Sequence, residues 1–103
     1  SDLNRRLSHE QQAMQDTDIP KRVPDYHLEQ MDGEHLLYHP VKALAMHLNE
    51  TASLVWQLCD GNREIKAIRE LLVQAYPGHA EQVAGDVSAV LQQFVDQDVV
   101  RIQ

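Results

Sequence analysis

Cysteine, glycine and aromatic residues are all scarce in this chain of 103 residues. The one cysteine, Cys59, cannot form an internal disulfide, and its place beside Asp60 at the end of an expected helix offers nothing that would lower its pKa, so we expect an inert thiol. The four glycines are scattered, whereas a phosphate-binding loop groups them ahead of a helix. With one Trp, three Tyr and one Phe, the core must be mainly aliphatic.

Long apolar runs are absent as well. No segment approaches the roughly 18 apolar residues that a membrane helix needs, and the first 30 residues lack the basic-then-apolar order of a signal peptide. We therefore expect a cytoplasmic protein that does not contact a membrane. The length suits one domain with a single modest core.

Positive charge is in deficit, with 9 Lys and Arg residues against 16 Asp and Glu residues and a net charge of −7. Nucleic-acid binding draws much of its free energy from Lys and Arg side chains that displace counterions from phosphates. An acidic surface of this kind disfavours a nucleic-acid partner.

Residues 1–22 are polar and poor in apolar residues. Prolines at positions 20 and 24 interrupt any helix there. We expect a flexible arm or a short frayed helix over residues 1–22 and one folded domain over residues 23–103. An arm that docks on a partner or on a second copy is the alternative.

Short extended segments follow the arm. Alternation and breakers predict strands over Tyr26–Met31, Glu34–His39 and Lys42–Leu48. Asp32-Gly33 is a two-residue turn signal that closes hairpins, and His39-Pro40 ends the second strand. The three strands predict an antiparallel sheet that needs a helical cover on its apolar face.

The rest of the chain has helical periodicity. Asn49 is a suitable N-cap for a first helix that stops near Gly61, and further helices are expected over Arg63–Tyr76 and Ala80–Asp96, before a short strand over Val99–Ile102. The inward positions are Ala52, Val55, Trp56 and Cys59, then Ile65, Ile68, Leu72 and Ala75, then Ala80, Val83, Ala84, Val87, Val90, Leu91 and Phe94. This element order predicts an α+β fold, a winged helix-turn-helix with a three-stranded N-terminal sheet and a three-helix bundle.

Six histidines raise the question of a metal site. His35 and His39 lie four apart on one strand and His47 lies on the next, so three imidazoles could converge. No Cys-x-x-Cys, His-Glu-x-x-His or paired carboxylates accompany them, and no nucleophile motif is present. We expect surface histidines, no metal, no cofactor and no enzyme activity.

A winged helix also raises DNA binding through its third helix. The polar face of that helix carries Glu81, Asp86 and Asp96 and no basic residue, which disfavours a nucleic-acid-binding regulator without excluding it.

The third strand offers a different kind of site. An edge strand has unpaired backbone groups that can accept a peptide as an extra strand, and small Ala43 and Ala45 would leave room for it beside the last helix. The alternative is an edge covered by the arm or by dimerisation, which would make the chain a structural module.

Short motifs in this order resemble the PqqD family of pyrroloquinoline quinone biosynthesis proteins over about residues 23–102. The matching motifs are Leu37-Tyr38-His39-Pro40, Leu48-Asn49-Glu50-Thr51-Ala52, Trp56-Gln57-Leu58-Cys59-Asp60-Gly61, the segment from Ile68 to Leu72, and Asp86-Val87 with Leu91.

The resemblance implies a small, non-catalytic peptide chaperone. Such modules bind the leader of a ribosomally made precursor peptide as an added strand and present it to a radical S-adenosylmethionine (SAM) enzyme. The implied peptide-binding residues are Lys42, Ala43, Leu44, Ala45, Met46 and His47 on the third strand, with Val83, Val87 and Leu91 on the last helix. A homodimer is a further expectation for the free edge.

Overall fold

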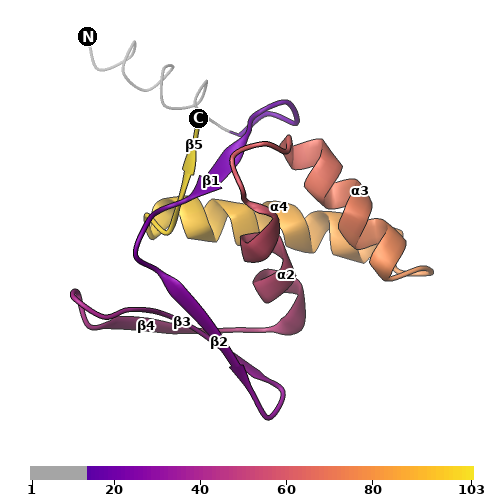
Figure 1. The fold of residues 1–103 in the computed structure, drawn as a ribbon. Coiled ribbons are helices and arrows are strands. Elements are labelled where there is room, and N and C mark those ends of the chain that lie inside the picture. The colour runs from indigo at the N-terminus through magenta and orange to yellow at the C-terminus, as the bar shows by residue number, and fades with distance from the viewer. Residues whose placement is uncertain (1–13) are drawn as a thin grey trace, which may run out of the picture.

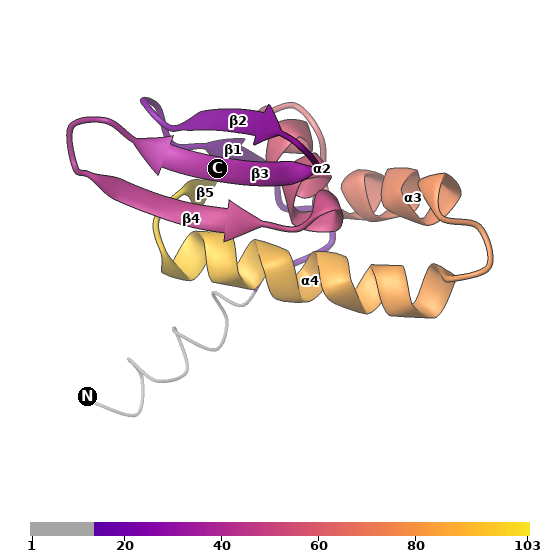
Figure 2. The ribbon, with the colours of Figure 1, turned by 90° about the horizontal axis from the view of Figure 1, so that it is seen from below.

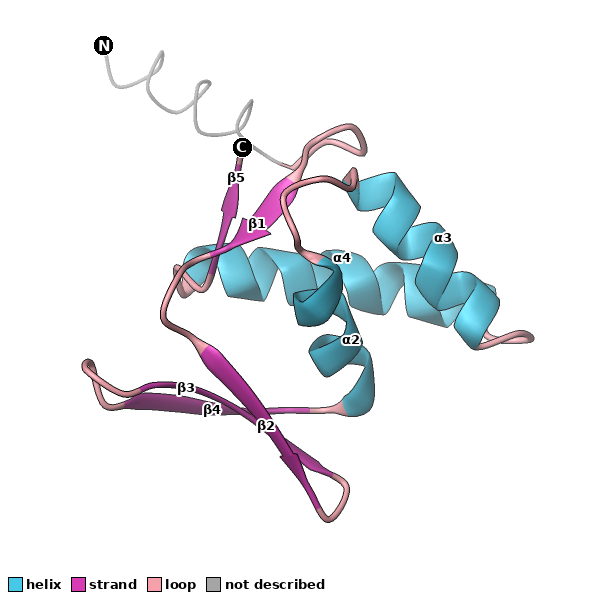
Figure 3. Cartoon of the chain, viewed as in Figure 1, coloured by secondary structure: helices cyan, strands magenta, loops and turns pink. Residues whose placement is uncertain are grey.

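The computed structural model describes residues 14–103, and Figures 1 and 3 show the order and type of its elements. They are β1 (Pro20–Arg22), β2 (His27–Met31), β3 (Glu34–His39), β4 (Leu44–Leu48), α2 (Glu50–Leu58), α3 (Ile65–Ala75), α4 (Ala80–Asp96) and β5 (Val100–Ile102). The expected α+β winged-helix arrangement is confirmed. A short strand not expected from the sequence, β1, is added to it.

The three-stranded antiparallel sheet has the order β2-β3-β4. Its first hairpin closes at Asp32-Gly33, where both residues have positive φ (52° and 78°), as a type I′ turn requires. The prediction of this turn is confirmed. β4 begins two residues later than expected, because Lys42 lies in a turn and Ala43 takes a left-handed φ of 54°.

Helix α2 begins as predicted. The Asn49 side chain accepts a hydrogen bond from the Ala52 backbone N–H (2.7 Å), which satisfies one free amide of the first turn. All four positions expected to face inward on this helix segment are buried, Cys59 included.

Helix α3 has no side-chain cap, since Glu64 stands at the N-cap position without such a bond. The backbone carbonyls of Asp18 and Asp16 accept from the first amides of α3, at Ile65 (2.9 Å) and Lys66 (3.0 Å). The segment before β1 therefore caps α3 through its backbone.

Most predicted core positions of α3 and α4 are buried. Ala75 and Ala80 are exposed instead, because they lie in the end turns of their helices, beside the α3–α4 connection. The expected inward orientation is wrong for these two residues.

A second, two-stranded sheet joins β1, early in the described residues, to β5, near the C-terminus. β1 pairs with β5 antiparallel, Pro20 with Ile102 and Arg22 with Val100. Residues 14–22 are thus part of the folded unit, which differs from the flexible arm expected over residues 1–22. Residues 1–13 of that expected arm lie outside the described residues.

The helices and the two sheets enclose one core of mainly aliphatic side chains. α4 runs along the molecule beside the other two helices, and in Figure 2 strand β4 is the strand of the larger sheet that lies nearest to it. In the described residues, no helix is long and apolar enough to cross a membrane.

Candidate functional site

Strand β4 is an edge of the larger sheet, hydrogen-bonded to β3 alone. The turn at Asp32-Gly33 directs the backbone groups of Glu34 toward β2, and alternation along β3 then directs those of His35, Leu37 and His39 toward β4. Their partners are Leu48, Met46 and Leu44. The N–H and C=O groups of the residues between these partners, Ala45 and His47, therefore point away from the sheet.

An apolar cavity of about 280 Å³ opens beneath this edge. Its lining residues come from the edge strand, from β3, from the segment before β2 and from the turn after α4: Leu44, Ala45, Met46, Leu37, Tyr26, Gln97 and Val99. The side chains of Leu44, Met46 and Leu48 share the face of β4 that turns toward the core. Leu44 is nevertheless 51% exposed, so the rim of the cavity presents apolar surface to solvent.

A buried histidine packs against Tyr26, one of the residues that line the cavity. The ring of His39 meets Tyr26 edge-on, with 5.0 Å between centroids, and its Nδ1 accepts a hydrogen bond from the Lys42 backbone N–H (3.1 Å). This contact fixes the loop between β3 and β4, in which Val41 is 88% exposed. Two exposed apolar side chains, Val41 and Leu44, thus lie at the start of the open edge.

Charged side chains lie near the same end of the cavity. Arg101 donates two hydrogen bonds to Asp98, from Nε (3.1 Å) and from an Nη (3.2 Å), and these bonds lower the pKa of the Asp98 carboxyl. The charge of Lys42, in the β3–β4 loop, adds to the lowering of the Asp98 pKa.

The structure brings together the six predicted residues from Lys42 to His47, although Lys42 and Ala43 lie in the turn before the strand. The three predicted residues of α4 lie elsewhere. Val83, Val87 and Leu91 are buried in the core, the last two with 0% exposure, and direct contact of a peptide with them stays a prediction.

Val83 also lines a second, more polar cavity of about 240 Å³, with Thr51, Tyr76, His79, Gln82 and Asp86. That cavity shares no residue with the one beneath β4. The buried stripe of α4 therefore supports the fold, while the turn that follows the helix reaches the cavity at the edge.

Sequence reasoning missed four residues of the cavity beneath β4: Tyr26, Leu37, Gln97 and Val99. Leu37 lies opposite Met46 in the observed register, which the predicted strand bounds did not fix. Gln97 and Val99 flank Asp98, whose positive φ of 59° bends the chain toward the cavity. No residue pattern in the sequence predicts this bend.

The three histidines that the sequence singled out do not converge. His35 and His39 turn their side chains to one face of β3, whereas His47, paired with Leu36, turns to the other. His39 is buried, so the interpretation of all six as surface residues is wrong for this one. Within residues 14–103, no three His, Cys, Asp or Glu side chains are grouped as metal ligands.

Cys59 is buried, and its thiol donates to the Val55 carbonyl (3.1 Å). Burial raises its pKa to about 12, with a smaller opposing effect of Arg22. A thiol that stays protonated at neutral pH is a poor nucleophile, as the sequence suggested.

Fold and edge together define a winged-helix module in which the outer edge of β4 lies open above an apolar cavity. The sequence profile described as coenzyme PQQ synthesis protein D (PqqD) matches residues 34–100, more than half of the chain. The chain belongs to the PqqD family. No curated protein matches the sequence.

Solved structures share this fold at low sequence identity. One is a solution structure of the PqqD truncation of Methylobacterium extorquens PqqCD, described as a functional, stand-alone recognition element for ribosomally synthesised and post-translationally modified peptides. It has a TM-score of 0.70, 22% identity, and coverage of 89% of this chain and 98% of that one.

Two others are peptide complexes. TbiB1 with the TbiA(beta) leader peptide has a TM-score of 0.64, 17% identity, and coverage of 79% of this chain and 94% of that one. Lasso peptide synthetase B1 with its leader peptide has a TM-score of 0.65, 17% identity, and coverage of 81% and 98%.

Proposed function

We propose that this chain is a non-catalytic recognition module that binds the leader of a ribosomally made precursor peptide as an added strand on β4. The observation that carries the proposal is the unpaired edge of β4 above an apolar cavity. Family membership and the leader-bound structures of similar fold support it. Presentation of the bound leader to a modifying enzyme, of the radical SAM type, completes the proposed role.

The geometry of the edge suits strand addition. Ala45 and His47 each offer one outward donor and one outward acceptor, and a peptide paired with them gains backbone hydrogen bonds whatever its sequence. Side chains of that peptide opposite Leu44 and Met46 would enter the apolar cavity. Backbone pairing would then give affinity and the cavity would give selectivity.

In this proposal, the three predicted peptide-binding residues of α4 support binding indirectly. Val83, Val87 and Leu91 fix the helix against the sheet, and the α4–β5 turn carries Gln97 and Val99 to the cavity. We infer that the leader contacts the turn after α4, and that the three buried residues hold that turn in position.

Amide hydrogen exchange followed by NMR tests the proposal, with the leader of a precursor peptide encoded next to this chain as the probe. In the free protein, we expect protection of the Met46 and Leu48 amides, which bond to β3, and fast exchange at Ala45 and His47. Peptide binding should slow exchange at Ala45 and His47 selectively. Unchanged exchange at both, with the peptide bound, would refute strand addition.

Ala45→Pro sharpens the test, since proline removes the outward donor without removing a hydrogen bond to β3. We expect loss of leader binding in calorimetry. The matched control is Gln30→Pro, at an outward-facing position of the opposite edge strand β2, which should retain the affinity. Equal affinity of Ala45→Pro and wild type would contradict the proposal.

The free edge also permits a homodimer through β4. Sedimentation of the protein at rising concentration, with and without peptide, distinguishes the two uses of the edge. A dimer that the leader dissociates shows competition for one edge, whereas a dimer that persists with the peptide bound lies elsewhere.

A further inference from the structure

An added strand on β4 presents its side chains alternately to two faces of the sheet, and this inference rests on the proposed binding at that edge. Residues of the added strand opposite Leu44 and Met46 turn toward the cavity. The residue opposite Ala45 turns to the outer face, because Ala45 itself lies on that face.

The outer face beside Ala45 carries a row of rings that stops short of the edge. His27, Tyr38 and Ala45 are directly opposite one another on β2, β3 and β4. The rings of His27 and Tyr38 lie 5.5 Å apart between centroids, with a tilt of 31°. The Tyr38 hydroxyl donates to Glu29 Oε1 (3.2 Å), which holds the ring over β2 and β3.

On the β4 side, Tyr38 has only the methyl group of Ala45 as its direct cross-strand neighbour. Neighbouring strands are about 4.8 Å apart, so a residue paired with Ala45 from outside has its Cβ about 10 Å from that of Tyr38. A long side chain at that position can lean over the methyl group and reach the Tyr38 ring, whereas a short one leaves the space empty.

We propose that Ala45 determines leader specificity: the small side chain leaves a notch that selects an aromatic side chain at the leader residue paired with it. An aromatic side chain would extend the existing His27–Tyr38 row at the ring separations of about 4.5–7 Å at which such pairs attract. The selected residue faces away from the cavity, so it is a second determinant of recognition beside the apolar side chain within.

Display of extended peptides of random sequence, selected on the wild-type protein, tests the inference. Cross-strand contacts seen by NMR between Ala45 and each selected peptide identify the paired position. We expect aromatic residues to be enriched there, and replacement of that residue by alanine to weaken binding by about two- to tenfold.

Two variants test whether the space beside Ala45 and the Tyr38 ring cause the aromatic preference. Ala45→Val keeps the backbone donor but fills the space, and Tyr38→Val removes the ring that the peptide would meet. Peptides selected on either variant should lack the aromatic preference. Leu36→Val is the matched control, because Leu36 lies on the same face of β3 as Tyr38 but pairs with His47 in the next row, and it should leave the preference unchanged.

The outcomes separate this inference from the proposed function. Peptides could bind β4 without aromatic enrichment at the paired position, or with basic residues there instead. Either result would overturn the proposed selection at Ala45 and leave the proposed strand addition supported. Retention of the aromatic preference in both Ala45→Val and Tyr38→Val also overturns it. Failure to select any peptide that pairs with β4 overturns both proposals.

Discussion

Strands β1 and β4 are both short, yet one is covered on both sides and the other is open. β1 pairs with β5, and its opposite edge meets residues 59–61, where Arg22 N–H donates to the Cys59 carbonyl (2.9 Å) and Gly61 N–H donates to that of Pro20 (3.0 Å). β4 pairs with β3 alone. Both edges of β1 are thus covered, whereas the outer edge of β4, where we propose that a peptide binds, is not.

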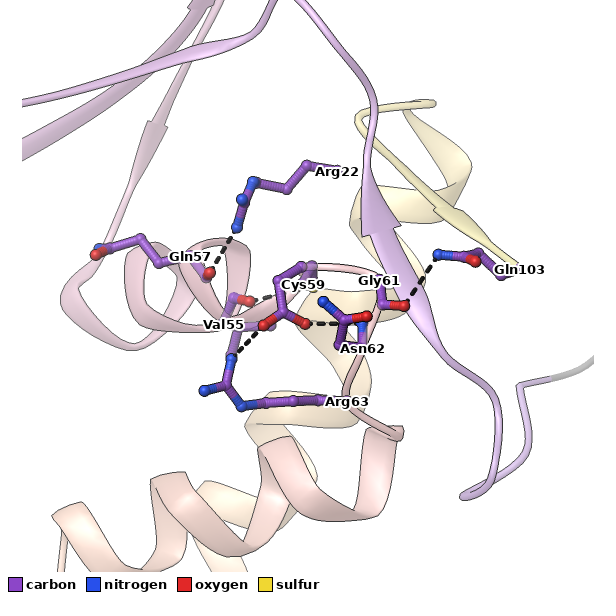
Figure 4. Close-up of polar contacts among 9 residues, drawn as sticks. Arg22, Val55, Gln57, Cys59, Gly61, Asn62, Arg63 and Gln103 are labelled. Carbon is purple, nitrogen blue, oxygen red and sulfur yellow. Dashed lines mark hydrogen bonds and ion pairs between the residues drawn. The ribbon is translucent and has the colours of Figure 1, made fainter.

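We call the covered edges of β1 the closed side and the uncovered edge of β4 the open side. Side chains add to the contacts of the closed side, as Figure 4 shows around the end of α2. Arg22 donates to the Gln57 carbonyl (2.6 Å) and lies 5.3 Å from the centre of the Trp56 ring, while Gln103 donates to the Gly61 carbonyl (3.2 Å). At the open side, Val41 and Leu44 expose apolar surface to solvent instead. We therefore expect the side chains at β1 to contribute mainly to stability and those at the edge of β4 to the proposed peptide binding.

The largest test of this division compares two leucines. Leu91→Ala empties a fully buried position and should lower the free energy of unfolding by about 2–5 kcal/mol, measured by urea denaturation. Leu44→Ala, at the exposed rim, should change stability by less than about 0.5 kcal/mol but weaken leader binding by about 1–2 kcal/mol, since the leader would bury that side chain. A stable Leu91→Ala protein with reduced leader affinity would instead assign Leu91 a direct contact.

Alanine substitution at two glycines with nearly equal φ should give a smaller loss of stability. Gly61 (φ 81°) and Gly33 (φ 78°) are both left-handed, so alanine at either should cost about 1–2 kcal/mol. At Gly61 the new Cβ would also lie 2.5 Å from Gln103 Nε2 and 3.1 Å from Lys21 Cδ, whereas nothing lies within 4 Å at Gly33. We expect the greater loss in Gly61→Ala by thermal unfolding, and equal losses would show that the closed side adjusts freely.

The smallest expected effect is on the pH dependence of stability, through the carboxyl of Asp60. The backbone N–H of Asn62 holds the pKa of Asp60 below its ordinary value of 3.8, and the Arg63 charge adds to this. A carboxyl with a lowered folded-state pKa stabilises the fold above 3.8 and loses that contribution as the pH falls through its folded-state pKa. Unfolding midpoints should therefore fall more steeply on acidification in wild type than in Asp60→Asn.

Asp98, at the open side, provides the comparison for this titration. Its lowered pKa depends first on exposed Arg101, so added salt should weaken its contribution more than that of Asp60, whose main donor is a backbone amide. Identical slopes with pH for wild type and Asp60→Asn would contradict the assignment of the Asn62 contact.

Local signals explain why most of the fold could be predicted. Asp32-Gly33 and Asn49 act through their nearest neighbours, and the helical stripes need only the spacing along the chain. The sequence did not predict β1, because a proline such as Pro20 usually interrupts regular structure. Proline is nevertheless tolerated as the first residue of a strand. Its partner β5 is distant in sequence, which no local pattern reveals.

The candidate site was predictable only in part, for a related reason. The edge position of β4 follows from the strand order, but apolar periodicity alone cannot tell a helix face that packs in a core from one that lines a groove. The family resemblance implies that Val83, Val87 and Leu91 contact the peptide, whereas their side chains are buried in the core, so direct contact stays a prediction. The residues at the cavity, Gln97 and Val99, follow α4 in a turn set by the backbone at Asp98.

The pairing of β1 with β5 places the C-terminal residue Gln103 beside the N-terminal strand, apart from β4 in the ribbon of Figure 1. A tether from Gln103 to another protein would start there without crossing the open edge. A captured peptide and the tethered protein would then meet at an effective concentration on the order of millimolar for a short flexible linker. A protein attached after Gln103 would then share a peptide captured at the proposed edge, with no contact between the two proteins.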